Sequence, residues 1–209
     1  MGEARRRQAM RAAVDAASNE VDFARVASAV TRLCRATSGE LGRDCLTQAV
    51  LAAGLLDRLS VSSEVRVGYA AWRVGDGDGD VVSHIPNPAY KPRNPREVMY
   101  HAWLEVGNQV FDVTTDQLTE KARALDALDG GTTEVQWTPP FLLLPFAKVS
   151  SYQEVAQGLK GLAFYKADEN LKAMVLDGYQ PPDAQDFANL WTVYQSPGAN
   201  VIGPNHLTK

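Results

Sequence analysis

The chain has two cysteines and three histidines, the side chains best able to act as nucleophile and base near neutral pH. Cys45 opens a segment that reads as a helix, DCLTQAVLAAGLLDRLS, with Asp44 as its N-cap. The first turn of a helix offers unpaired N–H groups and the positive end of the helix dipole, which favour a thiolate. Cys34 falls late in another helical pattern, on its apolar face, where a thiol is ordinary packing. We therefore expect Cys45 to be the nucleophile, although a cysteine taken alone is equally well read as a small buried hydrophobe.

The base that a thiol needs is a histidine held by a third group. His206 stands near the end of the sequence, and His84 borders the proline-rich segment 85–95, which we expect to be a loop. His101 opens a hairpin pattern, HAWLEV, a Gly107-Asn108 turn and QVFDVTT. The pattern selects His101 as the base.

The register of this hairpin predicts the third group. A two-residue turn at Gly107-Asn108 pairs residue 106 with 109 and residue 103 with 112, so His101, Trp103 and Asp112 project from one face. Asp112 is then diagonal to His101 and within side-chain reach. We expect Asp112 to orient His101 and Trp103 to pack over the site or in the core. The alternative is that His101 and Asp112 form only a surface cross-strand pair.

The pattern of apolar residues predicts an α+β fold, with helices packed on one side of a mostly antiparallel sheet. Helices are expected at 3–18, 21–36 and 44–60, and the period changes to two at 65–74, which predicts a strand. After the hairpin come a possible edge strand at 141–149 that contains Pro145, short helices at 152–159, 170–176 and 183–194, and a possible strand at 162–165. We expect residues 1–209 to form a single domain, since no linker or repeat interrupts them.

The order of these features resembles the transglutaminase-like superfamily. The matching part is a cysteine at a helix start, a strand, HAWLEV, a tight turn and VFDVTTDQ, over residues 42–118. It is particularly similar to bacterial transglutaminase-like proteins with an H-x-W-x-E hairpin followed by an aspartate and a D-Q pair. The resemblance implies a papain-like core with Cys45 as nucleophile, His101 as base and Asp112 as its partner. Asp116 is the fallback for the third position, because His101 and Asp112 are only eleven residues apart.

On this interpretation the protein is a cysteine-dependent hydrolase or acyltransferase that forms a thioester with a peptide, protein or small amide substrate. No cofactor is expected. The sequence does not choose between water and an amine as the acceptor of the acyl group. The alternative is a non-catalytic module that keeps the papain-like fold and uses its groove to bind a peptide.

Other kinds of site have weaker support in the sequence. The run from Asp76 to Asp80 has the first three acids of a calcium loop, but Val81 stands where a glycine is needed and Asn87 where the closing glutamate belongs. The cysteines and histidines have no zinc spacing, and the glycines at 75, 77 and 79 open no helix that could hold a phosphate. We therefore expect no metal site, and we interpret the run as a solvated turn.

Composition and charge exclude two classes of partner. The net charge of -4 and the pI near 5.4 argue against a general nucleic-acid binder, and the basic cluster Arg5-Arg6-Arg7 with Arg11 reads as a solvated helix face. No apolar run is long enough to span a bilayer, and the first residues do not resemble a signal peptide. We expect a cytoplasmic protein with no membrane partner and with both thiols reduced. The sequence gives no indication of oligomeric state.

Overall fold

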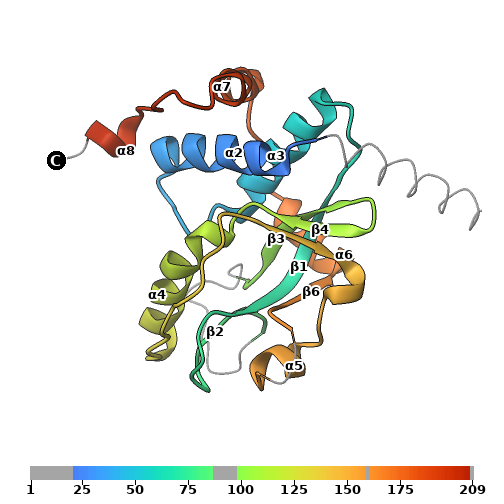
Figure 1. The fold of residues 1–209 in the computed structure, drawn as a ribbon, viewed down its shortest axis with the longest axis vertical. Helices are drawn as coiled ribbons and strands as arrows, with labels where there is room; N and C mark the ends of the chain where they lie inside the picture. The colour runs from blue at the N-terminus through green and yellow to red at the C-terminus, as the bar shows by residue number, and fades with distance from the viewer. Residues whose placement is uncertain (1–20, 87–97, 159–160, 208–209) are drawn as a thin grey trace, which may run out of the picture.

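The computed structural model describes residues 21–86, 98–158 and 161–207. Within these ranges the fold is α+β, with helices around a curled antiparallel sheet (Figure 1). The expected helix at 3–18, its basic cluster and most of the proline-rich loop at 85–95 lie outside the described residues.

The described part of the chain begins with two helices and continues with a mixture of strands and helices. The helices are α2 (Phe23–Thr37), α3 (Cys45–Arg58), α4 (Leu118–Asp129), α5 (Tyr152–Ala156), α6 (Glu169–Leu176), α7 (Ala184–Gln195) and α8 (Pro204–Leu207), with short 3-10 turns η1 (Thr115–Gln117) and η2 (Phe146–Lys148). The strands are β1 (Glu64–Arg73), β2 (Val81–His84), β3 (His101–Val106), β4 (Gln109–Asp112), β5 (Leu142–Pro145) and β6 (Ala163–Ala167).

The sheet has the strand order β2-β1-β3-β4-β5, and β6 also pairs with β1; every pairing is antiparallel. In the β3–β4 hairpin, Val106 pairs with Gln109 and Leu104 with Phe111, so the register predicted from the turn is confirmed. Gly107 turns the chain with φ 57°, a conformation that glycine adopts without strain. The hairpin therefore presents alternate residues of β3 and β4 to opposite faces of the sheet.

Strand β1 is the centre of the sheet and is paired along both edges. Gly68 lies opposite both His101 of β3 and Ala167 of β6. A Cβ atom at residue 68 would collide with the backbone of Lys166, so only glycine permits this close approach of β6. Strand β6 therefore packs closely on β1 at the same residue that lies opposite His101.

The two faces of the sheet carry different cores. One face contributes Val67, Leu104 and Phe111 to a cluster with apolar residues of α2, α3 and α7. The other contributes Trp72, Trp103 and Val110 to a second cluster with Leu118 and Ala122 of α4. Figure 1 shows α2, α3 and α7 grouped together, with α4 apart from them near β2. The predicted helical layer is therefore present on the first face, and α4, which the sequence pattern did not predict, covers the second.

Most of the expected elements are found with shifted ends. Pro145 ends β5, at the edge of the sheet, as its missing N–H requires. Strand β2 was not predicted, because it lies between the glycine-rich turn and the proline-rich segment.

The glycine-rich turn is exposed at residues 76–79, but Asp80 is buried, and its carboxylate accepts hydrogen bonds from the backbone N–H groups of Gly77 and Glu134. Asp80 is therefore a structural residue of this turn.

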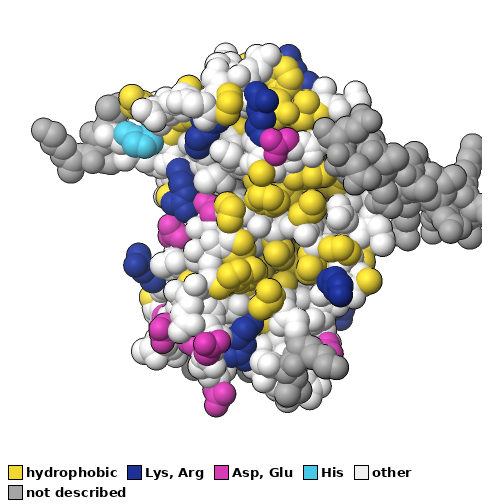
Figure 2. All heavy atoms as spheres, in the orientation of Figure 1, with side chains coloured by type: hydrophobic (Ala, Val, Ile, Leu, Met, Phe, Trp, Pro, Cys, Tyr) yellow, Lys and Arg dark blue, Asp and Glu magenta, His cyan; other side chains and the backbone are white. Residues whose placement is uncertain are grey.

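Charged side chains are mixed on the surface that Figure 2 displays. Hydrophobic side chains gather in the middle of this face, and lysine, arginine, aspartate and glutamate side chains are interspersed around them (Figure 2). Such a face lacks the continuous basic tract by which proteins bind nucleic-acid backbones. Among the described residues, no helix is both long enough and apolar enough to cross a membrane.

Candidate active site

Cys45 is the first residue of α3 and is only 4% exposed. Its sulfur receives a hydrogen bond from the backbone of Ala102. Ala102 follows His101 in β3, so the start of α3 lies beside the start of β3. Two elements that are far apart in the chain thus meet at the predicted nucleophile.

The N-terminus of α3 is not capped in the way that we expected. Asp44 occupies the N-cap position, but its side chain makes no capping hydrogen bond. Its backbone angles, φ -94° and ψ 21°, are outside the extended region from which a cap side chain reaches back to the helix. One carboxylate oxygen instead accepts from Gln48 Nε2 at 2.9 Å, and the other has no partner among the described residues. The expectation that the helix backbone occupies this carboxylate was therefore wrong.

Burial decides the ionisation of Cys45. Burial is the largest influence and raises the pKa of the thiol to about 11; the nearby carboxylates of Asp112 and Asp44 also raise it. The ammonium of Lys121 and the hydrogen bond from Ala102 act in the opposite direction. At neutral pH the resting site therefore holds a thiol rather than a thiolate, and a base must remove its proton before the sulfur can attack.

His101 and Asp112 are brought together as predicted. His101 Nε2 lies 2.8 Å from Asp112 Oδ2, and both side chains are completely buried. The ring of His101 is held between Trp72, perpendicular at 4.7 Å, and Trp103, nearly parallel at 6.2 Å. Its other nitrogen, Nδ1, is buried and has no hydrogen-bond partner among the described residues. His101 and Asp112 are therefore not a surface pair, and Trp103 packs in the core beside them.

Asp112 is held by more donors than the sequence suggested. Its Oδ1 accepts from the backbone N–H of Thr114 at 2.9 Å and from the Thr114 hydroxyl at 2.8 Å. Its Oδ2 also accepts from the Tyr165 hydroxyl at 2.8 Å, and that hydroxyl accepts in turn from Trp72 Nε1 at 2.8 Å. Strands β1, β3, β4 and β6 all contribute to this network, which fixes the carboxylate at one place and in one orientation.

These contacts set the charges of the pair. Burial favours the neutral acid at Asp112, but His101, Lys121 and the Thr114 N–H outweigh it and hold the pKa of the carboxyl below its usual range. Burial lowers the pKa of His101, and Asp112 only partly opposes this. The site therefore holds an aspartate anion beside a neutral imidazole at pH 7. Because the anion accepts from Nε2, the lone pair is left on Nδ1, the nitrogen without a partner in the described part of the chain.

Asp116, the fallback for the third position, lies elsewhere. Its Oδ2 accepts from Arg35 Nε at 3.0 Å and lies 2.8 Å from Arg35 Nη2. This ion pair joins η1 to α2 and does not involve His101. The structure thus places Asp112, and not Asp116, against the histidine.

Two ionisable residues near Cys45 were missed by the sequence interpretation. Lys121 of α4 is 1% exposed, and His84 ends β2; both line the same pocket as Cys45. His84 Nδ1 donates to the carbonyl oxygen of Tyr100 at 3.0 Å, and burial, followed by the charges of Lys121 and His101, lowers its pKa to about 3. A short strand between two loops gave no periodic signal for His84. The signal for Lys121 was a lysine on the apolar face of a helix, with Leu118, Ala122 and Leu125.

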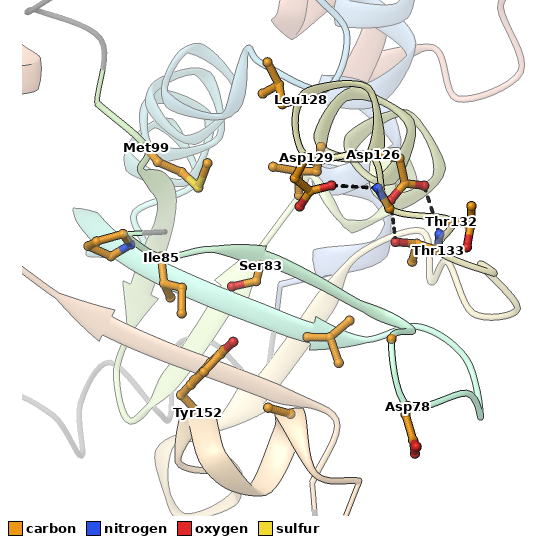
Figure 3. A pocket seen from close by; sticks show the side chains of 16 residues that line it. Asp78, Ser83, Ile85, Met99, Asp126, Leu128, Asp129, Thr132, Thr133 and Tyr152 are labelled. Carbon is orange, nitrogen blue, oxygen red and sulfur yellow. Dashed lines mark hydrogen bonds between the residues drawn. The ribbon is translucent and has the colours of Figure 1, made fainter. Parts of the chain in front are cut away.

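The pocket at Cys45 is small and shares three lining residues with a larger one. Its volume is about 300 Å³, and its apolar wall includes Val98, Met99, Leu125 and Leu128. Met99, Leu125 and Leu128 also line a second pocket of about 530 Å³, where Ser83 and Tyr152 add polar groups (Figure 3). Figure 3 shows Met99 and Leu128 on the same side of this second pocket, away from Asp78. Cys45 therefore lines one of two adjoining pockets that share three apolar residues.

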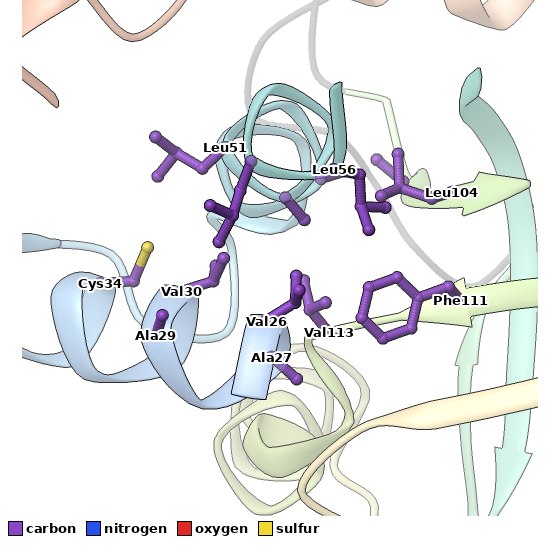
Figure 4. Close-up of a cluster of buried hydrophobic side chains, with 14 of the residues drawn as sticks. Val26, Ala27, Ala29, Val30, Cys34, Leu51, Leu56, Leu104, Phe111 and Val113 are labelled. Carbon is purple, nitrogen blue, oxygen red and sulfur yellow. The ribbon is translucent and has the colours of Figure 1, made fainter. Parts of the chain in front are cut away.

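Cys34 lies in the apolar core behind the site. It is 4% exposed in α2 and belongs to the cluster that packs α2 and α3 on the sheet (Figure 4). Burial, followed by the carboxylates of Asp44, Asp116 and Asp186, raises its pKa to about 12. Both cysteines are free thiols.

No group of three or more histidine, cysteine, aspartate or glutamate side chains within residues 21–86, 98–158 and 161–207 is arranged to hold a metal ion.

Comparison with known proteins gives a fold relationship alone. No protein-family description matches the sequence, and no curated protein matches it either. Among solved structures, one described as "The crystal structure of genomics APC5867" superposes with a TM-score of 0.58 at 15% identity, over 86% of this chain and 82% of that one. At this identity the likeness concerns the arrangement of elements, and those words name no activity for the related structure.

Proposed function

We propose that this protein is a cysteine-dependent acyl-transfer enzyme, a hydrolase or acyltransferase of the transglutaminase-like kind, with Cys45 as nucleophile, His101 as base and Asp112 as the orienting acid. The observation that carries the proposal is the buried bond from His101 Nε2 to Asp112 Oδ2, which leaves Nδ1 without a partner among the described residues. A backbone hydrogen bond from Ala102, the residue after His101, acts on the thiol of Cys45, so the start of β3 lies beside the proposed nucleophile. A surface cross-strand pair would have no reason to be fully buried.

In the proposed reaction His101 Nδ1 takes the proton of the Cys45 thiol, and the sulfur bonds to the acyl carbon of an amide. The carbonyl oxygen becomes an oxyanion, which the backbone N–H of Cys45 helps to hold. As the C–N bond breaks, the imidazolium returns its proton to the leaving amine, and a thioester remains. Water or another amine then attacks the thioester and gives a proton to His101. As the C–S bond breaks, the imidazolium returns that proton to the sulfur, which restores the Cys45 thiol. Asp112 stabilises the imidazolium during both halves of the cycle.

The two adjoining pockets support an extended substrate with an apolar group near the reacting carbonyl. Met99, Leu125 and Leu128 line the pocket of Cys45 and also line the larger pocket. Ligand sites are commonly apolar hollows of this size with a few polar groups. We propose a peptide, a protein segment or a small amide as the substrate. A cytoplasmic setting, which keeps thiols reduced, suits both free cysteines.

The second candidate is a peptide-binding module that keeps the same fold without catalysis. The high pKa and deep burial of Cys45 favour this alternative, because neither by itself makes the thiol reactive. The two candidates differ in whether His101 controls the sulfur.

The deciding experiment is the alkylation rate of Cys45 by iodoacetamide, measured by mass spectrometry in a Cys34→Ala background at pH 8. We expect His101→Ala to slow labelling at least tenfold, because the base that takes the thiol proton is lost. His206→Ala is the matched control, since His206 is exposed and belongs to α8. Equal labelling of Cys45 with and without His101, in variants that melt at the same temperature, would favour the binding module.

A further inference from the structure

Lys121 is a buried cation that the proposed reaction leaves without a role. Burying an ammonium is costly unless it is paired and hydrogen-bonded, so a lysine that is 1% exposed requires an explanation. Its Nζ donates to the carbonyl oxygen of Thr114 at 3.2 Å and to the Thr114 hydroxyl. It also lies 5.0 Å from the centre of the Trp72 ring, within the range of a cation–π contact.

These contacts join Lys121 to the His101–Asp112 pair. The Thr114 hydroxyl that accepts from Lys121 donates to Asp112 Oδ1, and Asp112 Oδ2 bonds His101. The Trp72 ring under the ammonium is the one that packs perpendicular to His101. Lys121 is therefore linked to the Asp112 carboxylate through one residue, Thr114. Lys121 contacts this network from α4, whereas Cys45 belongs to α3.

Lys121 and Cys45 also line the same pocket. Its volume is about 300 Å³, and the Lys121 ammonium lowers the pKa of the Cys45 thiol there. The buried charges of the site, one carboxylate and one ammonium, then cancel while His101 is neutral. Without the ammonium, Asp112 would be an uncompensated anion close to the position where a second anion, the thiolate, must form.

We propose that Lys121 is a positioning residue of the Cys45 site: its buried ammonium fixes Thr114 and Asp112 and favours ionisation of the Cys45 thiol at the moment of attack. This inference rests on the proposed function but concerns a residue outside the Cys45, His101 and Asp112 set. The titratable groups that face Cys45 or Lys121 from the packed elements are Arg43, Asp44, His84, Tyr100, His101, Asp112, Asp116 and Tyr179. Arg43 is exposed to solvent, whereas Lys121 is buried and is the cation of this group that acts on the Cys45 thiol.

The test compares Lys121→Met with Arg123→Met, again by alkylation of Cys45 in the Cys34→Ala background. Both changes remove one positive charge from α4, but Arg123 is exposed. Methionine keeps most of the volume and apolar stem of the lysine, so the fold is expected to persist. We expect Lys121→Met to slow labelling about tenfold at pH 8, the effect of one unit in the thiol pKa, and Arg123→Met to change it less than twofold. Labelling of a folded Lys121→Met variant at the unaltered rate would overturn the proposal.

A second variant separates the charge from the packing. Lys121→Ala leaves a space the size of propylamine, which can be offered back as propylammonium or, without the charge, as 1-propanol. We expect propylammonium to restore labelling at least threefold and 1-propanol to restore none. Rescue by both compounds would show that Lys121 only fills space, and rescue by neither would show that the charge is not what the site needs. The His101→Ala measurement reports on the proposed function separately, so the two ideas can fail independently.

Discussion

The two cysteines have similar burial but very different surroundings. Cys34 and Cys45 are each 4% exposed, each belongs to a helix, and both contribute to the cluster between the helices and the sheet. Burial raises the pKa of both thiols, to about 12 for Cys34 and about 11 for Cys45. By exposure and acidity alone, neither thiol is a nucleophile at neutral pH.

The difference lies in what can act on each sulfur. Three carboxylates raise the pKa of Cys34 beyond the effect of burial, and no group among those that influence it lowers the pKa. At Cys45 a backbone hydrogen bond and the Lys121 ammonium lower it, and the pocket that Cys45 lines also contains His84 and Lys121. Reactivity in this fold is therefore expected to come from a base and a cation brought to the thiol, and not from a thiol that is acidic on its own.

The largest effect on the difference in reactivity between Cys45 and Cys34 is expected from removal of the orienting acid, Asp112. Asp112→Asn keeps the shape of the side chain but removes the anion that fixes the His101 tautomer and stabilises the imidazolium. We expect alkylation or turnover at Cys45 to slow between about tenfold and ten-thousand-fold, by analogy with the aspartate of serine enzymes. Cys34 should label at its unaltered rate, which serves as the internal control. A silent Asp112→Asn variant would mean that His101 needs no anionic partner.

The pH dependence of labelling distinguishes the two thiols further. A raised pKa reduces the thiolate fraction at neutral pH, and that fraction grows tenfold per pH unit until the pKa is reached. Because the pKa is raised to about 11 for Cys45 and to about 12 for Cys34, Cys45 should hold more thiolate than Cys34 at any pH between 7 and 10. In a His101→Ala variant, where assistance by the base is absent, Cys45 should still label faster than Cys34, but by a smaller factor than in the unaltered protein. A plateau in Cys45 labelling near pH 8 would show instead that the site holds a preformed thiolate.

The sequence predicted the parts of the site that depend on short-range geometry. The Gly107-Asn108 turn determined the register of the hairpin, and the register placed Asp112 against His101. The first-turn position of Cys45 followed from helix start signals. In these cases the neighbours that determine the geometry are close in sequence, so their pattern can be read along the chain.

What the sequence could not predict depends on contacts between distant segments. Tyr165 reaches Asp112 from 53 residues away, and Lys121 reaches Thr114 because α4 folds over the second face of the sheet. Asp44 was expected to cap α3, but the local backbone angles turn its carboxylate to Gln48. Ionisation was also beyond the sequence, since the thiol pKa follows from burial, which only the packed structure reveals.

A smaller effect is expected from substitution of Cys34, the cysteine that we regard as structural. Cys34→Ala removes a buried sulfur from the cluster under α2 and α3, and the cavity should lower the free energy of unfolding by about 1–2 kcal/mol. Denaturant unfolding measures this loss. The labelling rate of Cys45 should stay within twofold, because Cys34 makes no contact in the His101–Asp112 network. Loss of Cys45 labelling in a stable Cys34→Ala variant would contradict the separation of roles between the two thiols.

The smallest effect is expected at Asp116, the acid that the sequence offered as an alternative to Asp112. Its carboxylate pairs with Arg35, which is 40% exposed, and an ion pair of this kind contributes about 0–1 kcal/mol. Asp116→Asn should therefore change the melting temperature little, since the amide oxygen can still accept from Arg35. Asp116 is also one of the carboxylates that raise the pKa of Cys34, so its neutralisation should speed Cys34 labelling slightly and leave Cys45 unchanged. The ratio of Cys45 to Cys34 labelling should accordingly fall by no more than about twofold. A large fall caused by slower Cys45 labelling would mean that Asp116 reaches His101 in solution, and the orienting residue would then have to be reassigned.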